Sequence, residues 1–256
     1  MFGAWVSEME RIWKSKSMLI LYFIFIALLA ANIWGGVLNG SGTLRFGEGK
    51  IELNSLTVPW YMMDGISLLL TLVVLPVIYV NQLSGEIHSG AYRLYVLRPF
   101  PRYQIWLSKL LALAATTIML IGFTFILVMA ASWLLFPRAD MMTLYGSNES
   151  VHVSKAILYN FNFYVLFALV SISKLMFCSA VCLFISRPLI SFVTIFILSF
   201  LLYFKIAVNL VILADPFQKL LLTLRPEGYP QFWIYSLGTL IVCALISFVK
   251  WQRKMV

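Results

Sequence analysis

Residues 110–136 read LLALAATTIMLIGFTFILVMAASWLLF, and no charged side chain interrupts them. An α-helix rises about 1.5 Å per residue, so this run is about 40 Å long as a helix. The hydrocarbon core of a bilayer is roughly 30 Å thick, and about 20 apolar residues cross it. The run is therefore predicted to be a transmembrane helix.

The whole chain has the composition of a membrane protein. Of its 256 residues, 62% are hydrophobic and 11% are charged, and the mean hydropathy is +0.93. Soluble domains average roughly 45–50% apolar and about 25% charged residues. We therefore predict an all-α integral membrane protein with a single transmembrane domain over residues 1–256. The predicted spans are residues 18–38, 65–80, 110–136, 163–185, 188–204 and 232–249.

The distribution of basic residues predicts how the six spans are oriented. With the N-terminus inside the cell, eleven Lys and Arg residues fall on the inner side and seven fall outside. Because inner loops carry the excess of Lys and Arg, we predict a multi-pass protein of the plasma membrane with both termini cytoplasmic. Most of the net charge of +9 then lies on the inner membrane face, which argues against nucleic acid as a partner.

Residues 1–17 are predicted to form an amphipathic helix on the cytoplasmic membrane surface. Apolar residues recur there at helical spacing, and polar residues occupy the opposite face. The polar face contains Ser7, Glu8, Arg11 and Lys14. The apolar face contains Phe2, Trp5, Val6, Met9, Ile12 and Trp13.

Residues 206–228, between the fifth and sixth spans, are too apolar for an ordinary loop. Asp215-Pro216 divides the segment, and turn residues from Arg225 to Gly228 close it. Each half is too short to cross a bilayer. We predict a short helical hairpin in the outer leaflet; a loop packed on the outer face is the alternative.

The sequence contains no arrangement of residues typical of an enzyme. His88 and His152 are predicted on opposite sides of the membrane, and the three cysteines lie within apolar runs. Residues 47–51 (GEGKI) resemble part of a phosphate-binding loop but lack the first glycine and the final Ser or Thr of that motif. We therefore expect no catalysis, no metal site and no nucleotide hydrolysis in this chain alone.

The cytoplasmic segment at residues 81–100 carries the most informative pattern. Pro99 lacks an N–H group and disfavours helical geometry at the preceding residue, so a helix that starts near Glu86 is expected to end there. In the first turn of such a helix, the carboxylate of Glu86 would be favoured by the helix dipole. Gly90 would let the backbone of a partner approach closely.

Two basic residues follow at the start of the third span. Arg102 and Lys109 are seven residues apart, so they are expected to share a helix face and to extend toward the inner interface. An ordinary basic connector is the alternative interpretation of this region.

Five of these residues resemble a pattern found in ABC-2 type permeases, the membrane subunits of ABC exporters. Members of that family commonly carry a Glu, a Gly four residues later, a Pro-hydrophobic-x-Arg group and a Lys that opens the third helix. The interfacial helix, the six spans and the apolar outer hairpin are also similar to that family. Ala91 departs from the Thr that often follows the Gly. The matching residues are Glu86, Gly90, Pro99, Arg102 and Lys109.

The resemblance implies that residues 81–100 include a coupling helix that docks into a separate ATPase subunit, with Arg93 and Arg98 in the docking segment. ATP and magnesium would be bound by that subunit, so this chain would need no cofactor of its own. The chain would be the permease subunit of an exporter that moves a hydrophobic or amphiphilic substrate, such as a peptide, antibiotic or lipid-like molecule, outward. A secondary transporter or channel independent of ATP is the alternative, and ionisable residues along a path would favour it.

Small residues on the first span predict a contact with a second permease protomer. Ala27, Ala31 and Gly35 repeat every four residues, which lets helix backbones pack closely in lipid. Packing against another helix of the same chain is the alternative. The family resemblance, in which the first and fifth helices commonly meet across a dimer, favours a homodimer or heterodimer.

Lys174 is the one charge within a predicted span. It is expected about 16 Å from either end of its helix, which is too far for its ammonium group to reach water easily. It should therefore face the bundle interior or a wet cavity, with Ser171 and Ser173 as possible acceptors. One interpretation is a polar contact in the substrate path; the other is a structural lysine bonded to backbone carbonyls.

Overall fold

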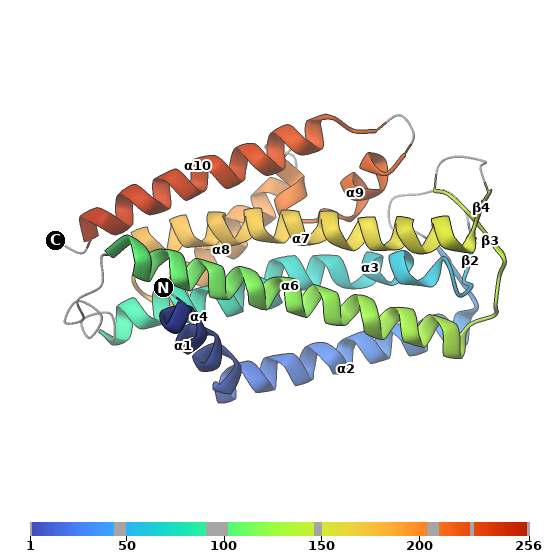
Figure 1. The fold of residues 1–256 in the computed structure, drawn as a ribbon, viewed down its shortest axis with the longest axis horizontal. Helices are drawn as coiled ribbons and strands as arrows, with labels where there is room; N and C mark the ends of the chain where they lie inside the picture. Colours follow the sequence, from blue (N-terminus) through green and yellow to red (C-terminus); the bar gives the residue numbers. More distant parts are fainter. Residues whose placement is uncertain are drawn as a thin grey trace.

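The computed structural model describes residues 2–43, 50–90, 102–145, 150–203, 210–225 and 228–254. It is a bundle of long helices, with both chain termini toward one end and four short strands at the other (Figure 1). We call these the terminal end and the hairpin end. In this part of the chain, five helices are long and apolar enough to cross a membrane. This confirms the prediction of a multi-pass α-helical membrane protein.

The first half of the chain supplies a short helix, two long helices and a strand pair. Strands β1 and β2 are antiparallel, with Ser41 opposite Glu52. Helices α3 and α4 are joined without a break by the π-helical turn η1, so residues 58–89 form one continuous helix. The elements are α1 (Phe2–Lys14), α2 (Lys16–Asn39), β1 (Ser41–Thr43), β2 (Lys50–Glu52), α3 (Val58–Leu69), η1 (Leu70–Val74) and α4 (Leu75–Ser89).

The second half contains the two longest single helices, α6 and α7, joined through a second antiparallel hairpin. Neither short hairpin was predicted from the sequence. The elements are α6 (Arg102–Leu135), β3 (Met141–Thr143), β4 (Ser150–His152), α7 (Val153–Phe184), α8 (Pro188–Tyr203), η2 (Leu210–Leu213), α9 (Phe217–Thr223) and α10 (Gln231–Lys254).

The continuous helix α3–η1–α4 lies at the centre of the bundle. Of its most apolar stretch, 72% is buried, against 22% for α2 and 17% for α10. The outer faces of α2 and α10 instead carry exposed large apolar side chains, such as Phe23 and Ile234. Such faces are suited to contact with lipid or with another protein in a membrane.

Helices α6 and α7 begin before the predicted spans, because the backbone hydrogen bonds of a helix continue into residues that are less apolar. The predicted span 163–185 is the second part of α7, which begins at Val153. Helix α6 likewise begins at Arg102, ahead of the predicted 110. Helix α8 has 16 residues, which corresponds to about 24 Å and is shorter than a typical span.

The expectation of a helix that starts near Glu86 is wrong. Glu86 lies in the last turn of α4, which ends where Gly90 adopts the left-handed conformation with φ of 73°. Residues 81–89 contain no proline, so the helix of the second span continues through them. Residues 91–101, which include Arg93, Arg98 and Pro99, lie outside the described residues.

Buried hydroxyl groups connect the long helices. Ser179 on α7 and Ser247 on α10 have their oxygens 2.6 Å apart. Tyr79 on α4 has its hydroxyl 2.8 Å from that of Thr117 on α6. In a membrane the hydrophobic effect does not drive helices together, so small residues and such hydrogen bonds contribute to their association.

The elements η2 and α9 pack on the continuous central helix near its π-helical turn. Thr71 Oγ1 lies 2.6 Å from the carbonyl oxygen of Ala214, and Ser67 donates to Asp215 Oδ1 at 3.0 Å. The ring of Phe217 stacks on that of Trp60, with centroids 6.4 Å apart. This is the segment predicted as an outer hairpin; residues 206–209 and 226–227 of that range lie outside the described residues.

We predict that Thr71→Val will destabilise the protein. The change keeps the size of the side chain but removes the donor from the buried Ala214 carbonyl, which should lower the free energy of unfolding by about 1–3 kcal/mol. Unfolding of the purified protein in mixed micelles would measure it. Thr194→Val is the matched control, because the Thr194 hydroxyl bonds only to Ile190 within α8. Equal losses for the two variants would contradict the prediction.

Candidate functional site

Four charged side chains meet at the terminal end of the bundle. They come from three elements: α1 supplies two, and α4 and α6 supply one each. Their formal charges sum to zero, with two carboxylates and two cations. We call these residues the ion cluster: Glu8, Arg11, Glu86 and Lys109.

Lys109 and Glu86 form the centre of the ion cluster. The Lys109 ammonium group donates to Glu86 Oε2 and lies 3.6 Å from Glu8 Oε1. Arg11 pairs with the other oxygen of Glu86 and with Glu8, and its guanidinium also donates to Gln82 at 3.4 Å. The side chains of Glu8 and Lys109 are only 7% and 6% exposed. The pairs that Lys109 makes are therefore largely shielded from water, whereas Arg11, with a side chain 36% exposed, lies at the edge of the cluster.

The position of Glu86 explains why it needs cations beside it. A carboxylate in the last turn of a helix faces the negative end of the helix dipole, which disfavours its charged form. Helices α4 and α6 bring Lys109 beside it, and α1 adds Arg11. In a buried setting, the attraction between the charges offsets the loss of hydration only when the partners are close and well bonded.

Two expectations about these residues are wrong. Lys109 does not extend toward the interface with water, because Glu86 and Glu8 hold its ammonium group inside the bundle. Glu8 was assigned to the solvated face of the N-terminal helix, yet it is 6% exposed and faces the ion cluster. Both differences have one cause: α1 packs against α6, so part of its polar face is covered.

The structure brings together only some of the residues predicted for ATPase coupling. Glu86 and Lys109 are in contact, and Gly90 ends the helix that carries Glu86. Arg102 is the first residue of α6, and its side chain lies outside the described part, as do the other three predicted residues. Sequence reasoning missed three partners: Glu8, Arg11 and Gln82. The sequence did carry one indication of these partners: Glu8 and Arg11 are three residues apart, a spacing that favours an ion pair on one helix.

Lys174 is buried within the helix bundle, as expected. Its exposed fraction is 0%, and its ammonium group donates to the hydroxyl of Ser199 on α8. The group also lies 5.5 Å from the centre of the Phe177 ring. The expected acceptors were wrong: Ser171 donates to a backbone carbonyl of its own helix, and Ser173 donates to carbonyls of α7 and of Ser236 on α10.

Two of the three small residues of α2 lie away from the chain's own bundle. Ala27 and Ala31 are exposed, and Gly35 is half-buried with no atom within 4 Å of the position a Cβ would take. Helix α2 instead packs inward through a different stripe: Met18, Phe25, Leu29 and Ile33. Among the described residues, Ala27 and Ala31 therefore show no packing against another helix of this chain, whereas Gly35 borders a space between α2 and α3.

Within the described residues, no group of three His, Cys, Asp or Glu side chains is placed to hold a metal ion. In the ion cluster, each carboxylate is paired with both cations. Its arrangement is suited to a mechanical role, since it connects α1, α4 and α6, and the last two are the helices on either side of residues 91–101. Comparison of the sequence with models of known protein families and with curated proteins gave no match.

We predict that Lys109→Met will strongly destabilise the protein. The change leaves Glu8 and Glu86 facing each other with Arg11 as their remaining cation, so the free energy of unfolding should fall by about 3–5 kcal/mol. Lys14→Met is the matched control, because it breaks an exposed ion pair with Glu10 of 3.5 Å. Denaturant unfolding in micelles would measure both. A loss no larger than that of the control would contradict the prediction.

Lys174→Met should behave in the opposite way. The variant replaces a buried ammonium group, which has no carboxylate partner among the described residues, with an apolar chain of similar length. Such replacements are often neutral or stabilising. We expect an unfolding midpoint equal to or above that of the unaltered protein. A drop comparable to that of Lys109→Met would show that the charge of Lys174 is needed for folding.

Proposed function

We propose that this chain is the permease subunit of an ABC-2 type exporter. It moves a hydrophobic or amphiphilic substrate, such as a peptide, an antibiotic or a lipid-like molecule, outward across the plasma membrane. A separate ATPase subunit binds ATP and magnesium and supplies the energy. A second permease protomer completes the pathway, and the small residues of α2 are the proposed seam between the two.

One observation carries this proposal: the contact between Glu86 and Lys109, 23 residues apart in sequence. The sequence pattern that resembles ABC-2 permeases includes both residues, and the fold places them in one buried pair. That pair lies where α4 ends and α6 begins, on either side of residues 91–101. An ATPase that moves this segment would act directly on the ion cluster.

The ion cluster gives a physical route for such a movement. Glu86 and Lys109 tie the two helices that flank the segment, and Arg11 and Glu8 tie α1 to both. A displacement of the segment cannot separate these charges without exposing them unpaired at a cost of about 3–5 kcal/mol. We infer that α1, α4 and α6 move together when the ATPase engages.

The proposal includes six spans with both termini in the cytoplasm. In this proposal the short helix α8 is the fifth span and α10 is the sixth, and η2 and α9 supplement the length of α8 toward the hairpin end. The terminal end is then cytoplasmic and the hairpin end is outside. The distribution of Lys and Arg supports this orientation, because the excess falls at the terminal end.

We expect the chain to co-purify with an ATPase and to need it for transport. The full chain would be tagged, expressed in its own host and purified in mild detergent, and its complex reconstituted in vesicles. Substrate-stimulated ATP hydrolysis that vanadate inhibits is the predicted result. If no ATPase co-purifies and the chain alone transports under an ion gradient, the secondary-transporter alternative is correct instead.

Arg98→Glu tests the docking segment at a residue that is not one of the four in the ion cluster. Reversing one charge there should reduce ATPase co-purification about ten-fold, which corresponds to about 1.4 kcal/mol of binding free energy. Arg187→Glu is the matched control, since Arg187 is an exposed residue between α7 and α8. Equal recovery of the ATPase with both variants would refute the assignment of residues 81–100 as the docking segment.

A further inference from the structure

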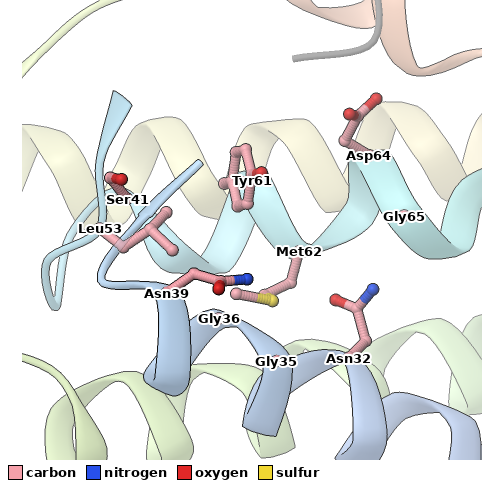
Figure 2. Close-up of a pocket in the computed structure, with 10 residues that line it drawn as sticks. All are labelled: Asn32, Gly35, Gly36, Asn39, Ser41, Leu53, Tyr61, Met62, Asp64 and Gly65. Carbon is pink, nitrogen blue, oxygen red and sulfur yellow. The ribbon is translucent and has the colours of Figure 1, made fainter. Parts of the chain in front are cut away.

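A cavity of about 300 Å³ lies between α2 and α3 near the hairpin end. Figure 2 shows its walls: successive turns of α2 form one side, α3 forms the other, and the start of the β1–β2 hairpin closes one end. Asn39, Ser41 and Gly65 are exposed, so the cavity opens to the protein surface. Its volume is at the lower limit of known ligand pockets.

Three glycines line this cavity, and they play different parts. A Cβ at Gly36 would lie 2.4 Å from Met62 Cε, and one at Gly65 would lie 2.3 Å from Asn32 Nδ2, so these glycines allow neighbours to approach closely. Gly35 differs, because a Cβ there would meet no atom within 4 Å. The space beside Gly35 is therefore open, because no described side chain of this protein fills it.

The polar groups around this space are amides and hydroxyls. Asn32 and Asn39 are two helical turns apart on α2, and both extend toward α3 in Figure 2. Tyr61 and Ser41 add two hydroxyl groups to the lining. Among the described residues, neither carboxamide makes a hydrogen bond, although Asn32 lies within an otherwise apolar membrane helix. A carboxamide in a low-dielectric setting gains free energy when a ligand bonds to it.

Charge in the cavity also limits the ligand. No Lys or Arg is among its described lining residues, and the carboxylate of Asp64 points away from α2 (Figure 2). Among the described lining residues, an anionic ligand has no cation to pair with, and the one carboxylate, that of Asp64, is directed away from α2. Hydrogen-bonding groups without formal charge fit the lining best.

We propose that this cavity binds the uncharged, hydrogen-bonding head of an amphiphile, with its apolar tail along the exposed outer face of α2. The head is an amide or a hydroxyl group, as in a peptide backbone or a neutral lipid. The role of this ligand as cargo rests on the proposed function, whereas its binding does not.

The test uses a thiol introduced into the open wall. Gly35→Cys is made in a chain whose Cys178, Cys182 and Cys243 are replaced by Ala, and the protein is placed in phosphatidylcholine nanodiscs without any ATPase. The measured quantity is the rate at which maleimide modifies position 35. The probes are N-dodecylacetamide and dodecanol, which are uncharged donors, and dodecyltrimethylammonium and dodecanoate, which are charged. Ala31→Cys is the control, because position 31 lies on the same helix outside the cavity.

The two uncharged probes should slow modification at position 35 but not at position 31, and the charged probes should have little effect. Asn32→Leu should weaken this protection about five-fold, the equivalent of about 1 kcal/mol for one hydrogen bond. Asn81→Leu, which changes an exposed carboxamide on α4, should not. Stronger protection by N-dodecylacetamide supports a peptide-like ligand, and equal or stronger protection by dodecanol supports a neutral lipid.

Equal protection by all four probes, equal protection at both positions, or full protection in the Asn32→Leu variant would overturn the inference. The assay contains neither ATP nor ATPase, so its outcome is independent of the coupling experiment. Failure of an ATPase to co-purify would remove the exporter proposal and leave the binding site standing. Failure of protection would remove the site and leave the exporter proposal standing.

Discussion

The cost of burying charge governs the arrangement of the terminal end of the bundle. Glu86 and Lys109 lie in helices that hydropathy alone would let slide or rotate against each other. Apolar side chains in lipid gain little from one alignment over another, whereas two opposite charges in a low dielectric must meet. Their contact therefore fixes how α4 and α6 align, and the pairing of Glu8 and Arg11 with them fixes where α1 lies.

The long helices were predictable because their signal is local. The length and the apolar character of a run such as residues 110–136 can be determined from that run alone, without any other part of the chain. The burial of Lys174 was predictable for the same reason, since the nearest water is too far along its own helix. The presence of several membrane helices and the burial of Lys174 could thus be derived from composition along the chain, whereas the predicted sixth span could not be confirmed: α8 is shorter than the helices that cross a membrane.

The partners of those residues could not be derived in this way. Lys174 bonds to Ser199, 25 residues later, and Lys109 contacts Glu8, 101 residues earlier in the chain. Such pairs depend on which helices become neighbours and on their rotation, and a single sequence carries little information on either. The helix end at Gly90 shows a different limit: the breaker was visible, but Pro99 was given more weight than the glycine that ends the helix with a positive φ.

The π-helical turn at Leu70–Val74 has a geometric consequence for the whole molecule. A π-bulge amounts to one residue inserted into an α-helix, and one residue corresponds to a rotation of about 100° about the axis. Before the turn, Ser67 bonds to Asp215 just ahead of α9; after it, Gln82 and Glu86 contact Arg11 of α1, and Glu86 also contacts Lys109 of α6. Deleting that single residue would restore a regular helix and turn Glu86 about a quarter of a revolution from its cations. One extra amino acid thus determines how far the side chains at one end of the central helix are rotated about its axis relative to those at the other end.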